Sequence, residues 1–198
     1  MKMAWRWYGE GNDSITLDHI RQIPGEEVIV WSMAYKVAGD AWETERLEAV
    51  VTQIESKGFS AEVVESVNVH DDIKIGRPTR DKYIDIYIDT IRKLSKVGVK
   101  VICYNFMPVF DWTRTDLYKE LPDGSNALFY EKDAIIDDPK EMAAKILEGA
   151  GEFTMPGWEP ERLAKLDELF KAYEGVTEEK LFENLKYFLE RIIPVCEE

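Results

Sequence analysis

Charged and polar side chains follow the apolar segments of this sequence that are typical of strands. Arg6 lies in the aromatic segment 4–8, and Glu65 ends the segment 61–65. A charged residue in such a segment needs either a structural partner or a ligand. Arg6 could bind an anion or form an ion pair, and Glu65 could bind hydroxyl groups or form a structural pair. The residues alone leave both interpretations open.

A second group of polar residues follows the apolar segment 99–105, in the stretch from Tyr104 to Arg114. Asp111, Trp112 and Arg114 follow one another closely in what reads as a loop, and exposed loops often carry function. An arginine can hold a carboxylate through two parallel hydrogen bonds, and a tryptophan can stack on a sugar. An interface between subunits is the alternative interpretation of this loop.

Nucleophilic and metal chemistry have weaker support in this sequence. Cys103 lies within an apolar segment and reads as a core residue, and Cys196 has no histidine near it in the sequence. His19 and His70 are the only histidines, and we interpret His70 as a surface-loop residue. Asp71 and Asp72 favour the start of a helix over a metal site. We therefore predict no metal ligand among residues 1–198.

The elements that position these residues alternate between strands and helices. Each gap between predicted strands holds one helix, and this alternation predicts right-handed βαβ units with a parallel sheet. The predicted strands are 4–8, 27–31, 61–65 and 99–105, and the predicted helices between them are 14–22, 41–57 and 80–96. In parallel folds, ligands bind at the carboxyl ends of the strands, where the polar residues above are expected.

The pattern changes after the fourth predicted strand. Residues 106–129 read as a loop, and three helices are predicted at 137–149, 159–173 and 177–193. A closed (β/α)8 barrel needs eight units, so the α/β pattern resembles about half a barrel. We predict one domain over 1–198, with four βα units in 1–117 and a loop and helical insertion in 118–198 that leads towards a fifth strand.

Composition limits the classes of partner. The 198 residues carry 25 Lys and Arg against 39 Asp and Glu, a net charge of −14. Such a charge argues against nucleic acid and anionic membranes as partners. Two cysteines without a CxxC pair favour a reducing compartment, and we expect a cytoplasmic protein. The first residues do not show the pattern of a secretory signal and no apolar run here is long enough to span a membrane, so we expect neither a leader nor a membrane span.

Several stretches resemble the mannonate dehydratase family, and the likeness extends along nearly the whole chain. These stretches are residues 6–9, 20–24, 64–70, 103–117, 121–125 and 192–198. The resemblance implies a xylose-isomerase-like TIM barrel and a hydro-lyase of hexuronate (glucuronate) catabolism, which converts D-mannonate to 2-dehydro-3-deoxy-D-gluconate and water. It also implies Mn²⁺ or Fe²⁺ as cofactor, and we expect a homodimer.

The family's histidine, cysteine and aspartate ligands begin with a His-Pro-Asp-Asp-Pro motif in its second half, so the resemblance places them, with the catalytic groups, beyond residue 198. What it implies here is one wall of the substrate site. The candidate substrate-binding residues are Arg6, Glu65, Ser66, Tyr104, Asn105, Asp111, Trp112 and Arg114. The stretch 31–35 departs from the family's usual run.

The expected roles follow from the chemistry of these side chains. Arg6 and Arg114 would hold the carboxylate or hydroxyls of the sugar acid, Glu65 and Asn105 would bind hydroxyls near the metal, and Trp112 would exclude water. Two alternatives stay open. One is a sugar isomerase or epimerase on the same barrel, which differs in its product. The other is a half-barrel without activity of its own that acts with a partner chain, which differs in its molecular mass.

Overall fold

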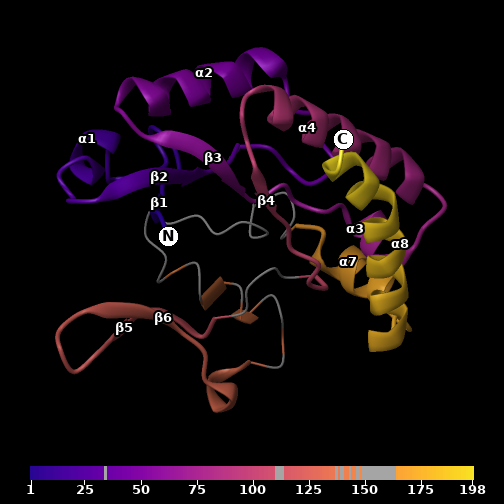
Figure 1. Ribbon diagram of the computed structural model, residues 1–198. Coiled ribbons are helices and arrows are strands. Elements are labelled where there is room, and N and C mark those ends of the chain that lie inside the picture. Colours follow the sequence, from indigo (N-terminus) through magenta and orange to yellow (C-terminus); the bar gives the residue numbers. More distant parts are fainter. Residues whose placement is uncertain are drawn as a thin grey trace. The chain divides into compact units, whose positions relative to one another are not determined.

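The protein is described here from a computed structural model (Figure 1). The structure describes residues 1–33, 35–109, 114–136, 138, 141–142, 144–145, 148 and 164–198. The chain forms two compact units. The first comprises Met1–Phe106 together with Thr177–Glu198, and the second comprises Met107–Val176.

A four-stranded parallel sheet forms the centre of the first unit. Its strands are β1 (Met3–Arg6), β2 (Glu26–Trp31), β3 (Ser60–Glu65) and β4 (Val101–Cys103), in the spatial order β1-β2-β3-β4. This confirms the predicted α/β class with a parallel sheet. The strands at the two edges are shorter than predicted. Just past the end of β3, the Val67 N–H donates a hydrogen bond to the carbonyl of Cys103, the last residue of β4, at 3.1 Å.

Helices pack along one face of this sheet (Figure 1). They include α1 (Leu17–Ile20), α2 (Thr44–Ser56) and α4 (Arg80–Lys96), each within a range predicted from the sequence. Trp31 and Val64 point to the helical face and are almost fully buried. Their strand neighbours Val30 and Val63, on the opposite face, are only half-buried. The two faces of the sheet therefore differ in how well they are covered.

A short helix, α3 (Asp71–Ile75), begins at the acidic pair that favoured a helix start, although the sequence indicated no range for it. His70 is its N-cap, because its Nδ1 accepts a hydrogen bond from the Asp72 N–H at 3.1 Å. The His70 ring also stacks on Tyr83, with ring centroids 3.5 Å apart. The interpretation of His70 as a surface-loop residue is therefore wrong. Gly76 ends the helix with a φ of 76°, a conformation that glycine adopts readily.

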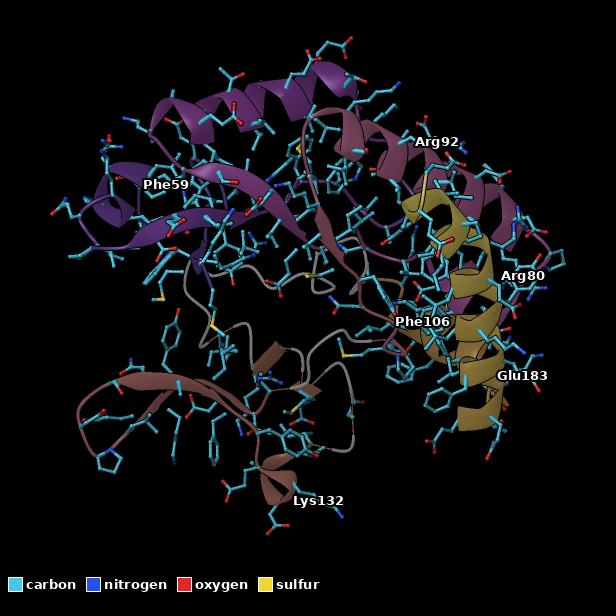
Figure 2. All side chains as sticks on the ribbon, viewed as in Figure 1. Phe59, Arg80, Arg92, Phe106, Lys132 and Glu183 are labelled. Atoms are coloured by element: carbon cyan, nitrogen blue, oxygen red, sulfur yellow. The ribbon has the colours of Figure 1, made fainter. Side chains whose placement is uncertain are left out.

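The last helix, α8 (Glu178–Cys196), packs on α3 and α4. Phe188 on its apolar face is fully buried and lies edge-on to Tyr87. Phe106 also reaches this helix, and its ring lies 6.1 Å from that of Phe188 (Figure 2). In chain order, α8 is the helix that returns to the sheet unit after β4, and the second unit is inserted between them. The predicted division at residue 117 instead grouped this helix with the insertion.

The second unit contains an antiparallel hairpin of β5 (Asp116–Glu120) and β6 (Asn126–Phe129). The loop predicted over 106–129 is therefore wrong for these two strands. The unit also holds a 3-10 turn, η1 (Lys132–Ala134), and α7 (Leu166–Tyr173). Helix α7 lies within the predicted helix 159–173, of which residues 159–163 lie outside the described residues, as does about half of the predicted helix 137–149. Among the described helices, none combines the length and the apolar character that a membrane span requires.

Candidate functional site

The carboxyl ends of the four parallel strands bring two of the predicted residues together. Arg6 ends β1 and Glu65 ends β3, and the Nε of Arg6 lies 3.9 Å from Oε2 of Glu65. Both side chains lie on the less covered face of the sheet. Arg6 pairs in register with Val30 of β2, and Val30 pairs with Val63 of β3, so the three side chains point to the same face. Glu65 lies two residues after Val63 on β3, and because side chains alternate along a strand, it points to the same face of the sheet as Val63.

Arg6 also binds the backbone of the neighbouring strand ends. Its Nη1 donates to the carbonyls of Trp7 at 2.6 Å and Val30 at 3.3 Å, and its guanidinium carbon lies 4.4 Å from the Tyr8 ring centroid. Burial lowers the pKa of the Arg6 guanidinium, and the negative charge of Glu65 opposes that shift. The Arg6 side chain is 22% exposed and that of Glu65 is 44% exposed, so the carboxylate is the more accessible partner.

Ser66 connects the ends of three strands. The Oγ of Ser32, just after β2, donates to the Ser66 carbonyl at 2.9 Å. The Ser66 hydroxyl donates to Oδ1 of Asn68 at 2.9 Å and accepts from Nδ2 of Asn105 at 3.4 Å. Ser66 is buried, with 9% of its surface exposed, and the peptide bond that joins it to Glu65 is cis. Two of the predicted residues, Ser66 and Asn105, are therefore brought together by a hydrogen bond.

Cys103, the last residue of β4, and Tyr104, which follows it, point to opposite faces of the sheet. Cys103 pairs with Glu65, and burial together with that carboxylate raises the pKa of its thiol. Tyr104 instead lies against Phe188 of α8, with ring centroids 5.9 Å apart. Side chains alternate between the faces of a strand, so Tyr104 lies on the helical side. The structure thus does not group Tyr104 with Arg6 and Glu65.

The remaining predicted residues belong to the second unit. Asp111 and Trp112 lie outside the described residues. Arg114 is described and lies two residues before β5. The site that the structure describes is thus formed by first-unit residues alone, at the ends of β1, β2, β3 and β4.

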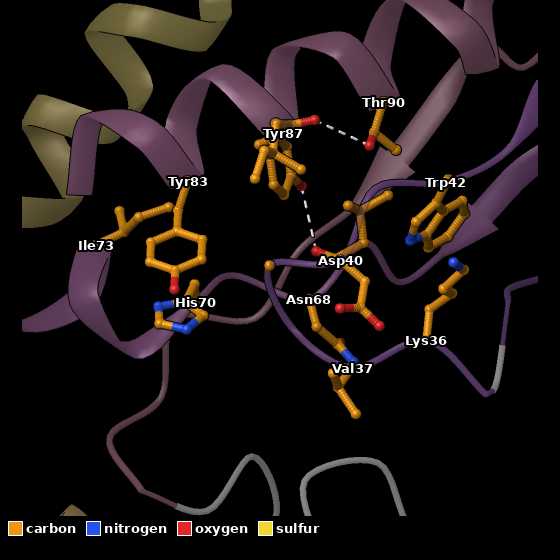
Figure 3. Close-up of a pocket in the computed structure, with 13 residues that line it drawn as sticks. Lys36, Val37, Asp40, Trp42, Asn68, His70, Ile73, Tyr83, Tyr87 and Thr90 are labelled. Atoms are coloured by element: carbon orange, nitrogen blue, oxygen red, sulfur yellow. Dashed lines mark hydrogen bonds between the residues drawn. The ribbon is translucent and has the colours of Figure 1, made fainter. Parts of the chain in front are cut away.

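A small pocket lies beside this edge, between the loop that follows β2, the segment after β3, and α4 (Figure 3). Its volume of about 10 Å³ is enough for a single water molecule and too small for a sugar acid. The Tyr87 hydroxyl donates to the Val67 carbonyl at 3.3 Å, and its burial raises its pKa. The pocket is therefore part of the packing behind the strand ends.

Sequence reasoning missed two residues of the strand-end network, Ser32 and Asn68. Both are small polar residues within two positions of a strand end or of Ser66, and their only signal was that position. Within the described part of the chain, no three His, Cys, Asp or Glu side chains gather closely enough to hold a metal ion. The described residues thus do not fit an Mn²⁺ or Fe²⁺ centre.

With this geometry, the chain can be compared with known proteins. The sequence pattern of the D-mannonate dehydratase (UxuA) family matches residues 1–198. The chain belongs to this family. It is 58% identical to a mannonate dehydratase of Shouchella clausii over all of this chain and 55% of that protein. It is 61% identical to mannonate dehydratase 1 of Bacillus licheniformis over 99% of this chain and 54% of that protein.

A solved structure has the same fold as this family member. The crystal structure of mannonate dehydratase from Streptococcus suis serotype 2 superposes with a TM-score of 0.82 at 37% sequence identity, over 100% of this chain and 50% of that chain. The chain thus spans about half the length of the curated relatives and of the solved structure that it matches.

Proposed function

We propose that the protein containing this chain is a hydro-lyase that removes water from D-mannonate to give 2-dehydro-3-deoxy-D-gluconate. The observation that carries the proposal is the polar edge of the sheet, with Arg6, Glu65, Ser66 and Asn105 together, in a chain of the D-mannonate dehydratase family. A sugar acid offers one carboxylate and several hydroxyls, and these side chains are suited to bind both.

The proposed reaction requires side chains that orient the substrate and stabilise the charge that develops on it. The proton on C2 lies next to the carboxylate and is weakly acidic, so its removal requires stabilisation of the charge that develops. The C3 hydroxyl then leaves, and the enol tautomerises to the keto acid. Glu65 and Asn105 would orient the substrate hydroxyls. Arg6 would orient Glu65 and place positive charge near the substrate carboxylate, and Arg114 would bind the same end of the substrate.

We propose Mn²⁺ or Fe²⁺ as the cofactor, on family resemblance. Such an ion polarises substrate oxygens when it is bound. Its ligands are expected in the part of the family sequence that follows the region matched by this chain. We further propose Trp112 as the residue that closes the site against water, Asp111 as a substrate-binding residue, and a homodimer in the cytoplasm as the assembled form.

The uneven coverage of the sheet supports a larger (β/α)8 barrel, of which this chain supplies four units. Parallel sheets are normally covered on both faces and rarely leave apolar edges unpaired. Among the described strands, β1 and β4 each pair on one side only, and Met3 and Val101 on them are 60% and 49% exposed. Further strands of the barrel would cover both these edges and the half-buried inner face.

The test is to incubate the full-length protein with D-mannonate and Mn²⁺ and to measure the molecular mass of the product by mass spectrometry. The proposal predicts a 2-keto acid that is lighter than the substrate by one water. A product of unchanged mass would identify an isomerase or epimerase instead. The absence of any conversion with either Mn²⁺ or Fe²⁺ would contradict the proposed activity.

A further inference from the structure

The hydroxyl of Ser66 has one proton, and the geometry around it determines where that proton points. The Ser66 Oγ lies 2.9 Å from Oδ1 of Asn68 and 3.4 Å from Nδ2 of Asn105. An amide oxygen can only accept a hydrogen bond, so the Ser66 proton is directed to Asn68. The Ser66 oxygen is then left as an acceptor for Asn105.

This direction fixes the orientation of the Asn105 amide. Its NH₂ group faces Ser66, so the planar amide presents its Oδ1 on the other side. Asn105 would otherwise be free to present either a donor or an acceptor to a ligand, because the two ends of an amide are similar in shape. The acceptor Oδ1 favours a ligand group that donates, such as a hydroxyl of a sugar acid.

Ser32 and Asn68 hold the centre of this chain of hydrogen bonds. Ser32 donates to the Ser66 carbonyl at 2.9 Å, which ties the residue to the end of β2. Asn68 also lines the pocket of about 10 Å³ beside α4. Ser66 itself is buried.

We propose that Asn68 and Ser32 are positioning residues that act through Ser66 to make Asn105 a hydrogen-bond acceptor for a substrate hydroxyl. This rests on the proposed function for the identity of the ligand as a polyhydroxy acid. The orientation of the amide itself does not depend on that function. Loss of the Asn68 acceptor frees the Ser66 proton to turn to Asn105, and the amide can then reverse.

The enzymatic test uses two substitutions of one residue in the full-length protein with Mn²⁺ bound. Asn68→Asp keeps an acceptor for Ser66, whereas Asn68→Ala removes it. We expect Asn68→Ala to lower kcat/KM for D-mannonate about tenfold, as for loss of one ordinary hydrogen bond, and Asn68→Asp to restore most of it. Asn126→Ala, at an exposed position of β6, is the control and should leave kcat/KM unchanged. Equal losses in Asn68→Asp and Asn68→Ala would overturn the proposal, because the aspartate still offers Ser66 an acceptor.

A second measurement does not require activity. The side-chain amide signals of Asn105 are followed by nuclear magnetic resonance in protein labelled with ¹⁵N-asparagine, and are assigned by their loss in Asn105→Asp. We expect these signals to shift in Asn68→Ala and to return towards their original positions in Asn68→Asp. Signals that are the same in Asn68→Ala and the unmodified protein would overturn the positioning role. The expected shifts without any turnover of D-mannonate would instead support the positioning role and contradict the proposed function.

Discussion

Arg6 of β1 and Glu65 of β3 face each other across the end of β2, with the arginine Nε 3.9 Å from the glutamate Oε2. Arg6 is the more enclosed of the two, and its Nη1 is held by the carbonyls of Trp7 and Val30. The pair therefore combines the two interpretations that the sequence left open. Arg6 has the contacts of a structural residue, and the carboxylate it faces remains accessible to a ligand.

Replacement of Glu65 by glutamine tests whether this carboxylate binds substrate. We expect Glu65→Gln to lower kcat/KM about tenfold to a hundredfold, as for loss of a hydrogen bond to a charged group. The matched control is Glu62→Gln, on the same strand, where Lys2 and Lys100 bind the carboxylate. That variant should keep its kcat/KM. Equal effects of the two variants would remove Glu65 from the site.

The packing of α8 can be tested with two phenylalanines of that helix. Phe188 is fully buried, whereas Phe182 is 61% exposed. We expect Phe188→Ala to lower the free energy of unfolding by about 3–5 kcal/mol and Phe182→Ala by about 0.5 kcal/mol or less, measured in urea. Similar values for both variants would contradict the docking of α8 on α4.

A substitution at Gly39 tests how closely the stacked rings of His70 and Tyr83 pack against the backbone. A Cβ on Gly39 would lie 2.7 Å from Cδ2 of His70 and 2.9 Å from the Tyr83 ring, whereas one on Gly11 would meet nothing within 4 Å. Both glycines have positive φ, so alanine strains the backbone at either position. We expect Gly39→Ala to cost about 1–3 kcal/mol more unfolding free energy than Gly11→Ala. Equal costs would mean that the His70 and Tyr83 rings are not packed against residue 39.

The ion pairs of Glu62 predict a dependence of stability on pH. Hydrogen bonds from Lys2 and then Lys100 lower the pKa of the Glu62 carboxyl below its ordinary value. A carboxyl with a lowered pKa in the folded state stabilises the fold above its unfolded pKa, and this stabilisation is lost as pH falls through the folded pKa. We therefore expect Glu62→Gln to be less stable than the unmodified protein at about pH 6, with the difference shrinking as the pH falls through the lowered pKa of Glu62. Urea midpoints at several pH values measure this, and a constant difference would contradict it.

The parts of the fold that the sequence predicted were those with a strong repeating pattern. Arg80–Lys96 has apolar residues at helical spacing, and the observed helix has the predicted ends. The hairpin was missed because β5, from Asp116 to Glu120, is mostly exposed and charged. For α3, the acidic pair Asp71 and Asp72 indicated where a helix starts, but five residues are too short for a periodic signal that would give its length. The apolar face of α8 was visible in the sequence, but its packing partner was not.

For the candidate site, too, the sequence indicated only the residues that have an unusual position in the pattern. Arg6 and Glu65 stood out because charged residues at the ends of apolar strands are uncommon. Tyr104 could have been assigned to the helical face by the alternation of side chains along its strand. Ser32 and Asn68 could not have been selected, because small polar residues are frequent after strands and only the contacts of Ser66 show their connection.

We propose that this polar edge belongs to a site for removal of water from D-mannonate. The most direct measurement is to run the reaction in D₂O with the full-length protein and Mn²⁺, and to analyse the product by mass spectrometry and nuclear magnetic resonance. We predict a 2-keto acid that has lost one water and carries one deuterium at C3, because the enol takes its new proton from solvent. A product that keeps all its oxygen atoms and carries deuterium at C2 would contradict this account and indicate isomerisation or epimerisation.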